Sequence, residues 1–142
     1  VVVVAAGNNG PRTMSITTPG ISRKVITVGC SDDDREVLVG GNRMVDYSGR
    51  GPTAACICKP DLVAPGCSVV SCSSRADKYT IKSGTSMSTP IVSGAVALLL
   101  ERFPDMSNKD VKLRLRESSV DIGLPRNQQG WGLLDVGKML ER

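Results

Sequence analysis

The chain has 142 residues, a net charge of +4, 40% hydrophobic residues and only 3% aromatic residues. This length is typical of one domain, and the apolar content excludes a disordered chain. The longest apolar run, Ile91–Leu100, is about half of what a membrane span requires, so no membrane segment is expected. Because aromatic residues are scarce, we expect a core of Val, Ala, Leu and Ile, which suits helices packed on a sheet.

The first half of the chain has the pattern of strands separated by turns. Val1–Ala6 is a β-branched apolar run, typical of a central parallel strand that is buried on both faces. The segment 36–47 is ambiguous between a short strand and a hairpin. Further strands are expected at Lys24–Gly29, Asp61–Ala64 and Ser68–Ser71.

The second half has the pattern of helices. A helix is predicted over 85–102, and a second one begins after Ser107 and runs to Ser118, because Ser107 and Asp110 have the spacing of a capping box. A short helix is expected within Trp131–Leu140. Strands followed by long helices indicate an α/β fold with a mainly parallel sheet, and residues 1–142 are expected to form one structural unit.

A group of basic residues alternates with apolar residues in the second predicted helix. This pattern is typical of the solvated face of an amphipathic helix. Nucleic-acid binding is the alternative, but no aromatic residues interleave with the charges, so no nucleic-acid partner is expected. The basic residues are Lys109, Lys112, Arg114 and Arg116.

Five cysteines and one acidic run raise the question of bound metal. An odd number of cysteines does not suggest a secreted disulfide framework, and apolar neighbours favour buried thiols. A zinc site built from Cys56, Cys58, Cys67 and Cys72 is an alternative, but its spacing departs from the usual pairs. Asp32–Asp34 is interpreted as a solvated turn, with calcium binding as the alternative.

Two segments carry the residues expected to do chemistry. Gly84–Pro90 reads Gly-Thr-Ser-Met-Ser-Thr-Pro and places Ser86 at a helix N-terminus, where the helix dipole favours the negative charge that nucleophilic attack creates. A plain N-cap is the alternative for Ser86. Ala5–Asn8 places the Asn8 amide just past the carboxyl end of a strand, where open α/β sheets bind ligands. The chain contains no histidine to act as a base.

Together these segments resemble the subtilisin-like serine proteases, the subtilases. The family's nucleophile motif, Gly-Thr-Ser-Met-Ala-Ser/Thr-Pro, is matched by Gly84–Pro90 except at Ser88, and its Ala-Ala-Gly-Asn motif is matched by Ala5–Asn8. Pro60–Gly66 and Gly130–Val136 also resemble family segments. The resemblance extends over essentially the whole chain.

The resemblance implies roles for individual residues. Ser86 corresponds to the nucleophile, and Asn8 corresponds to the side chain that donates to the developing oxyanion, together with the Ser86 N–H group. Thr85 corresponds to the residue that shapes the turn before the nucleophile. The wall of the substrate pocket corresponds to Ala5, Ala6 and Gly7.

The family order of the catalytic triad is Asp, His, Ser, and the first two precede the oxyanion asparagine. The resemblance therefore places both residues upstream of Val1. It implies that residues 1–142 are the C-terminal part of a subtilase catalytic domain, with only the C-terminal portion of the subtilisin-like sheet and its flanking helices.

The function implied is that of a serine endopeptidase that hydrolyses peptide or protein substrates through an acyl-enzyme on Ser86, with this chain inactive alone. The alternatives are a pseudoprotease or a module that self-associates through an exposed sheet edge. No cofactor is assignable, and calcium in a longer protein stays open. Pro90-Ile91, Pro19–Gly29 and the free cysteines resemble intracellular bacterial subtilases, which favours a cytoplasmic location, although secretion stays open.

Overall fold

The computed structural model describes residues 1–31, 46–74 and 78–141. The strand or hairpin predicted at 36–47 lies almost entirely outside these residues. The Asp32–Asp34 turn also lies outside them, so neither interpretation of that turn has a structural counterpart here.

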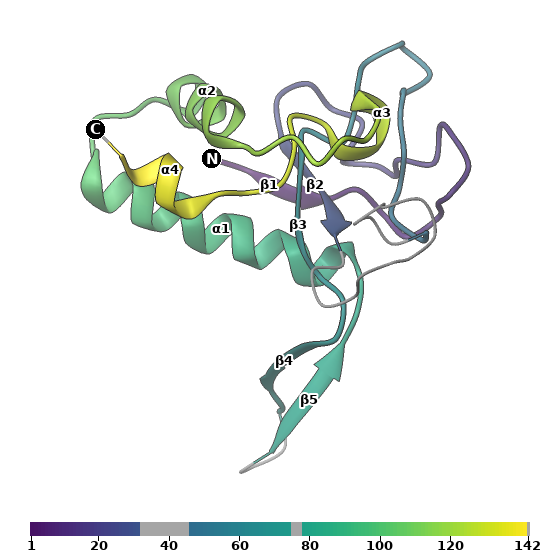
Figure 1. The fold of residues 1–142 in the computed structure, drawn as a ribbon, viewed down its shortest axis with the longest axis horizontal. Coiled ribbons are helices and arrows are strands. Elements are labelled where there is room, and N and C mark those ends of the chain that lie inside the picture. Colours follow the sequence, from purple (N-terminus) through teal and green to yellow (C-terminus); the bar gives the residue numbers. More distant parts are fainter. Residues whose placement is uncertain (32–45, 75–77, 142) are drawn as a thin grey trace.

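A parallel sheet forms the centre of the molecule (Figure 1). Its strands are β1 (Val3–Ala5), β2 (Ile26–Ser31) and β3 (Leu62–Pro65), which lie in the order β1-β2-β3. Every residue of β2 is buried, as expected for a strand with a neighbour on each side and cover on both faces. The prediction of a mainly parallel sheet is confirmed, with strand ends displaced by one or two residues.

The two edges of this sheet differ. Within the described residues, β1 pairs only with β2, and the preceding Val1 and Val2 are 45% and 60% exposed. At the opposite edge, Leu133 forms a parallel bridge with Val63 and an antiparallel bridge with Val120. The C-terminal segment therefore covers the β3 edge, whereas the β1 edge stays open.

The two long helices have the predicted bounds. Helix α1 (Thr85–Arg102) packs against all three parallel strands, and α2 (Asn108–Ser118) follows it. The Ser107 side chain accepts a hydrogen bond from the Asp110 N–H group while the Asp110 carboxylate accepts one from the Ser107 N–H group. The predicted capping box is therefore confirmed.

The short helix expected within Trp131–Leu140 is present as α4 (Val136–Leu140), and the unpredicted α3 (Arg126–Gln129) precedes it. The segment around Leu133 is extended against β3. Gly132, with a φ of 129°, permits this path. The residues around Leu133 therefore pair with the β3 edge and are not helical.

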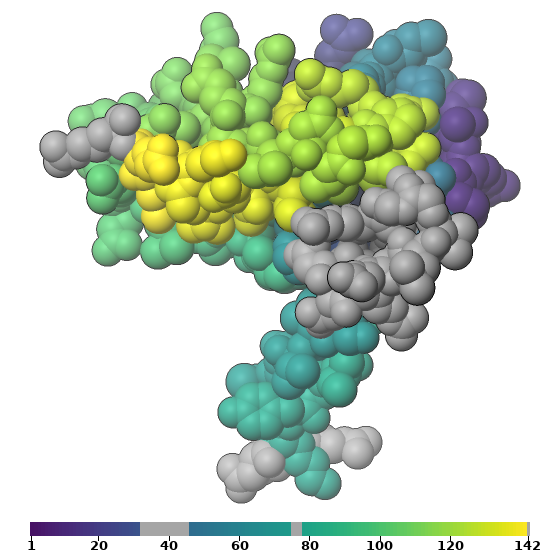
Figure 2. All heavy atoms as spheres, viewed as in Figure 1, coloured from purple at the N-terminus to yellow at the C-terminus, as the bar shows by residue number. Residues whose placement is uncertain are grey.

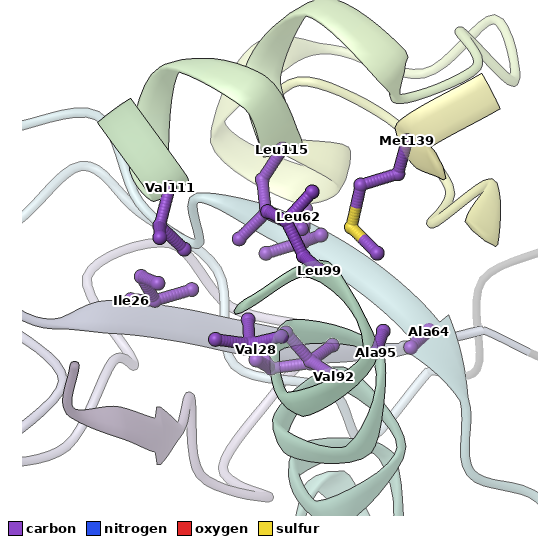
Figure 3. Close-up of a cluster of buried hydrophobic side chains, with 11 residues drawn as sticks. Ile26, Val28, Leu62, Ala64, Val92, Ala95, Leu99, Val111, Leu115 and Met139 are labelled. Carbon is purple, nitrogen blue, oxygen red and sulfur yellow. The ribbon is translucent and has the colours of Figure 1, made fainter. Parts of the chain in front are cut away.

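The core lies between the sheet and helices α1, α2 and α4, and Figure 3 shows its side chains converging. Its fully buried members are aliphatic residues and one methionine, as the scarcity of aromatic residues predicted. They include Val28, Leu62, Val92, Leu99, Val111, Leu115 and Met139.

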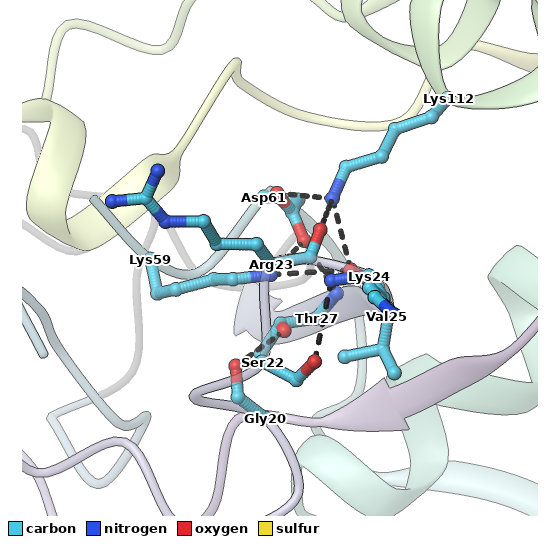
Figure 4. A network of polar contacts seen from close by, with 9 residues as sticks. All are labelled: Gly20, Ser22, Arg23, Lys24, Val25, Thr27, Lys59, Asp61 and Lys112. Atoms are coloured by element: carbon cyan, nitrogen blue, oxygen red, sulfur yellow. Dashed lines mark hydrogen bonds and ion pairs between the residues drawn. The ribbon is translucent and has the colours of Figure 1, made fainter. Parts of the chain in front are cut away.

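A buried charge network joins β3 to α2 (Figure 4). The Asp61 carboxylate accepts hydrogen bonds from Lys59 Nζ at 2.6 Å and from Thr27 N at 2.7 Å, and it pairs with Lys112 Nζ at 3.2 Å. Lys112 Nζ also donates to the carbonyl oxygens of Arg23 and Val25. Burial lowers the pKa of Lys59, although its bond to Asp61 acts in the opposite direction.

This network corrects the interpretation of the basic residues on α2. Lys109 and Arg116 are exposed, as predicted, but Lys112 is half-buried and paired with Asp61. Arg114 is also half-buried, donates to the Glu141 carbonyl oxygen at 2.6 Å and lies over the Phe103 ring. A pattern of alternating charge does not show which long side chains fold back onto the protein.

An antiparallel hairpin projects from the body of the molecule (Figures 1 and 2). It consists of β4 (Val69–Cys72) and β5 (Tyr79–Lys82), in which Val70 pairs with Ile81. Val70, Tyr79 and Ile81 are each more than half exposed.

The expectation of buried thiols is correct only for Cys30, which lies in the central strand β2. Cys56, Cys58 and Cys72 are exposed and Cys67 is partly so, because they belong to loops and to the projecting hairpin. In the part of the chain that the structure describes, no three metal-ligating side chains lie together, and no helix is long and apolar enough to cross a membrane.

Candidate active site

Ser86 lies exposed in the first turn of α1, immediately beyond the end of the parallel sheet. The N-cap is Gly84, whose φ of 151° suits glycine and which has no side chain to cover the helix end. The alternative in which Ser86 is a plain N-cap is therefore wrong. Among the described residues, the Ser86 N–H group has no hydrogen-bond acceptor, so it remains available to an anion.

Thr85 joins the two segments that were expected to do chemistry. Its N–H and its hydroxyl group both donate to Asn8 Oδ1 at 3.0 Å, and its hydroxyl oxygen accepts from the Gly7 N–H group at 3.2 Å. Thr85 is fully buried whereas Asn8 is exposed, so these three bonds are partly buried. They fix the loop after β1 against the start of α1, across 77 residues of sequence.

The orientation of the Asn8 amide follows from these bonds. Because Oδ1 is held by Thr85, the Nδ2 group is the end of the amide that is left to donate. Nδ2 lies beside the helix start, since a Cβ atom at Gly84 would come within 3.3 Å of it. The Asn8 amide and the Ser86 N–H group are thus two donors at one helix end, an arrangement suited to a developing oxyanion.

Residues at the carboxyl end of β3 position the Gly84 turn that precedes α1. The Gly84 N–H group donates to the Gly66 carbonyl oxygen at 2.8 Å, and the Ser88 hydroxyl donates to the Ala64 carbonyl oxygen at 2.9 Å. Ser88, the residue that departs from the family motif, therefore anchors α1 to β3. A side chain at position 66 would overlap the Ser88 hydroxyl, so glycine is required there.

A groove of about 510 Å³ lies beside Ser86, between β1, the segment Thr17–Pro19 and the first turns of α1. Ala5 lines this groove. Ala6 is fully buried, and Gly7 has a φ of 96° and packs so closely that a Cβ atom would lie 2.5 Å from the Thr17 hydroxyl. The three residues predicted as a pocket wall are therefore adjacent, but in this chain Ala5 is the one that faces the groove.

The sequence identified Thr85 as a residue that shapes the turn, but not the bonds of its buried hydroxyl group to Gly7 and Asn8. It missed the contribution of Thr17. Thr17 lies just before the Pro19-Gly20 turn, and that turn was the available sign that the segment folds back toward β1. The Thr17 N–H group donates to the Ala6 carbonyl oxygen at 3.0 Å, which holds this segment beside β1.

Comparisons with known proteins agree with this geometry. The model of the subtilase family of peptidases matches residues 1–132. The serine protease AprX of Bacillus subtilis is 41% identical over 132 residues, and halolysin of Haloferax mediterranei is 36% identical over 135 residues. The matches cover 84% and 95% of this chain.

Solved structures show the same likeness. Sphericase superposes with a TM-score of 0.79 at 32% identity, over 92% of this chain and 46% of that one. The chain spans 30% of the length of AprX and 23% of that of halolysin. Family model, relatives and fold agree over nearly the entire chain, and the chain therefore belongs to the subtilase family.

Proposed function

We propose that this chain supplies the nucleophile, Ser86, and the oxyanion donor, Asn8, of a serine endopeptidase. The observation that carries the proposal is the Thr85 bridge, which sets the Asn8 amide beside the helix end that bears Ser86. If Asn8 only formed a turn, its amide would not need two hydrogen bonds from Thr85 that leave the Nδ2 group available as a donor. Membership of the subtilase family supports the same assignment.

The proposed reaction is acyl transfer. Ser86 Oγ attacks the scissile carbonyl carbon as its proton passes to an imidazole base, and the carbonyl oxygen becomes an oxyanion that accepts hydrogen bonds from Asn8 Nδ2 and Ser86 N–H. The C–N bond then breaks and the amine leaves with the proton from the imidazole. Water hydrolyses the acyl-enzyme by the same steps and releases Ser86.

The base is proposed to come from a segment that precedes Val1. This chain has no histidine, and the family order places the catalytic Asp and His before the oxyanion asparagine. Residues 1–142 are then the C-terminal part of the catalytic domain. Without its base the Ser86 hydroxyl has nearly ordinary reactivity, so the chain alone is expected to be inactive.

The proposed substrates are peptides or proteins with an uncharged side chain near the scissile bond. Every described residue that lines the groove beside Ser86 is uncharged, including Ala5, Thr17 and Thr18. A charged substrate side chain would lose its hydration there without gaining a partner, and this is unfavourable.

Labelling by a fluorophosphonate tests the nucleophile in a protein that carries this chain together with the catalytic Asp and His segment. Ser86→Ala should abolish labelling. Ser93→Ala is the matched control, because Ser93 is also exposed and lines the same groove. Undiminished labelling of Ser86→Ala, or equal loss in Ser93→Ala, would contradict the proposal. Labelling of the 142-residue chain alone would contradict the need for a separate base.

We also propose that the protein works in a reducing, cytoplasmic compartment. Cys56, Cys58 and Cys72 are exposed thiols, which an oxidising environment would pair or modify. Alkylation of the protein isolated from its cells, followed by mass spectrometry, should find all three modified by the alkylating reagent. An oxidised or disulfide-bonded thiol among them would count against this location.

A further inference from the structure

A second concave site lies along α2 and shares no residue with the groove at Ser86. It is a pocket of about 510 Å³. Of the described residues that line it, four are basic, two are apolar and none is acidic. The residues that matter are Lys24, Lys109, Lys112, Arg116, Leu113 and Trp131.

The helix places three of the cations in one row. Lys109, Lys112 and Arg116 are spaced by three and four residues, which puts them on the same face of α2. The two acidic residues of the helix, Asp110 and Glu117, lie about a quarter of a turn away by the same periodicity. Like charges at this spacing destabilise a helix slightly, so an anion in the pocket would relieve their repulsion.

One of the four cations already has an ion-pair partner, which it shares with Lys59. Lys112 Nζ pairs with Asp61 and donates to two carbonyl oxygens, as Figure 4 shows. Lys24, Lys109 and Arg116 are exposed, and none has an ion-pair partner within the described residues. Three positive charges thus line the pocket without an ion-pair contact to a described acidic residue.

The floor of the pocket is suited to an apolar group. Trp131 is half-buried, with Lys112 Nζ 5.8 Å from its ring centroid, and Leu113 is 41% exposed. An aromatic ring and a leucine side chain between cations favour a ligand that carries both apolar and anionic groups.

The length of the row restricts the ligand further. Arg116 is seven positions after Lys109, which is about 10 Å along a helix at 1.5 Å per residue. One carboxylate or one phosphate cannot reach both ends. In an extended peptide, side chains alternate between two faces, so two acidic side chains four residues apart share one face at about 13 Å, a span that the long Lys109 and Arg116 side chains can meet, and an apolar side chain midway between them lies on the same face.

We propose that this pocket binds an acidic peptide segment of a partner protein. Carboxylates of the segment pair with Lys24, Lys109 and Arg116, and an apolar side chain between them covers Trp131. The site lies apart from the proposed active site and does not depend on its activity.

Trp131 gives a direct measurement, because it is the single tryptophan of the chain. The probe is the peptide acetyl-Glu-Glu-Leu-Glu-Glu-amide, in which the central leucine shares a face with the first and last glutamates, titrated into the protein while tryptophan emission is recorded. The expected result is a saturable change in emission, with an affinity that falls as sodium chloride is added. The same peptide with glutamine in place of glutamate should produce no saturable change.

Charge reversal locates the binding. Arg116→Glu and Lys109→Glu should each weaken peptide binding about fivefold or more, since each removes one attraction and adds one repulsion. Lys78→Glu is the matched control, because it makes the same change in net charge on the exposed hairpin. Circular dichroism verifies folding, and Arg116→Gln replaces Arg116→Glu if the reversal unfolds the protein.

Three results would overturn the proposal. The first is a glutamine peptide that binds as well as the glutamate peptide. The second is an equal loss of affinity in Lys78→Glu. The third is inorganic phosphate, or a single-stranded oligonucleotide, that changes Trp131 emission at the same concentration as the peptide, because this would show general anion attraction.

Discussion

Thr85 shows how one side chain can determine the geometry of a reactive site that it does not enter. Its hydroxyl accepts from Gly7 and donates to Asn8, so it links the loop after β1 to the helix that carries Ser86. A serine could make the same bonds, but the β-branched threonine has fewer rotamers to lose. Ser86 and Asn8 therefore depend on a residue with no part in bond making.

We expect Thr85→Val to disturb both stability and reactivity. The substitution keeps the shape but leaves the Gly7 N–H group without its acceptor, which costs about 1–3 kcal/mol of unfolding free energy. Asn8 Oδ1 keeps the bond from the residue 85 N–H group but loses the one from the hydroxyl group. The Asn8 amide is then held less firmly, and fluorophosphonate labelling should fall, by at most the loss of one oxyanion donor, about 100- to 1,000-fold, a range known from subtilisin itself.

The control for this prediction is Thr89→Val, one turn further along α1. The Thr89 hydroxyl donates to the Thr85 carbonyl oxygen, which already lies within a helix, so its loss should be nearly neutral. Chemical denaturation and labelling are measured on both variants. Equal effects in the two would show that Thr85 has no special position.

At the scale of elements, the contact between β3 and α1 sets the position of Ser86, the proposed nucleophile, relative to the end of the sheet. Gly66 and Ala64, at the end of the strand, receive hydrogen bonds from Gly84 and Ser88, at the start of the helix. These bonds hold the first turn of α1 against the carboxyl end of β3. Gly94, further along α1, has no such neighbour, since a Cβ atom there would meet nothing within 4 Å.

Glycine replacements should therefore have opposite effects at these two positions. Gly66→Ala forces a methyl group against Ser88 and should reduce stability by about 1–3 kcal/mol. Gly94→Ala removes a flexible residue from a helix interior and should raise the stability of this chain by about 0.5–1 kcal/mol. Thermal unfolding of both variants checks the prediction, and a stabilising Gly66→Ala would contradict the packing described here.

The α2 cap makes a separate prediction about pH. Hydrogen bonds from the Ser107 hydroxyl and N–H groups lower the pKa of Asp110 below its ordinary value of 3.8. The stabilisation that it provides is fully present above that value and is lost as pH falls through the lower folded-state pKa. Asp110→Asn should thus be less stable than the natural chain at pH 6, and the difference should shrink toward pH 2.5, as measured by urea unfolding. A constant difference across this range would contradict the cap's contribution.

Particular residues show how far the sequence was sufficient. The bounds of α1 and the α2 capping box were predictable because local signals, a glycine turn and a Ser-x-x-Asp spacing, agree with the tertiary structure. The Lys59–Asp61–Lys112 network was not, because it depends on which lysines fold back over β3. Asn8 and Ser86 were identified from motifs, but the bond that orients Asn8 required knowledge of where residue 85 is buried.

At the scale of the whole molecule, the open edge of β1 distinguishes this chain from a closed α/β domain. A parallel strand with one free edge among the described residues, next to exposed Val1 and Val2, favours pairing with another strand. Self-association through this edge, the alternative raised by the sequence, stays a prediction.

Light scattering of the 142-residue chain should detect this association. Val2→Lys should favour the monomer, because a charge at the edge opposes strand pairing. Val70→Lys is the control, since Val70 is 61% exposed on the hairpin and Val2 is 60% exposed. Recovery of the monomer by Val70→Lys alone would place the contact on the hairpin, and a monomeric natural chain would remove the proposal.

The cover that Leu133 provides at the far edge of the sheet has a consequence for stoichiometry. A sheet with two open edges can pair with further copies at both edges and form fibres, whereas a sheet with one open edge can pair with only one copy. When two copies join β1 to β1 around a twofold axis, neither copy has an open edge left in this sheet. Assembly through the main sheet should therefore stop at a pair.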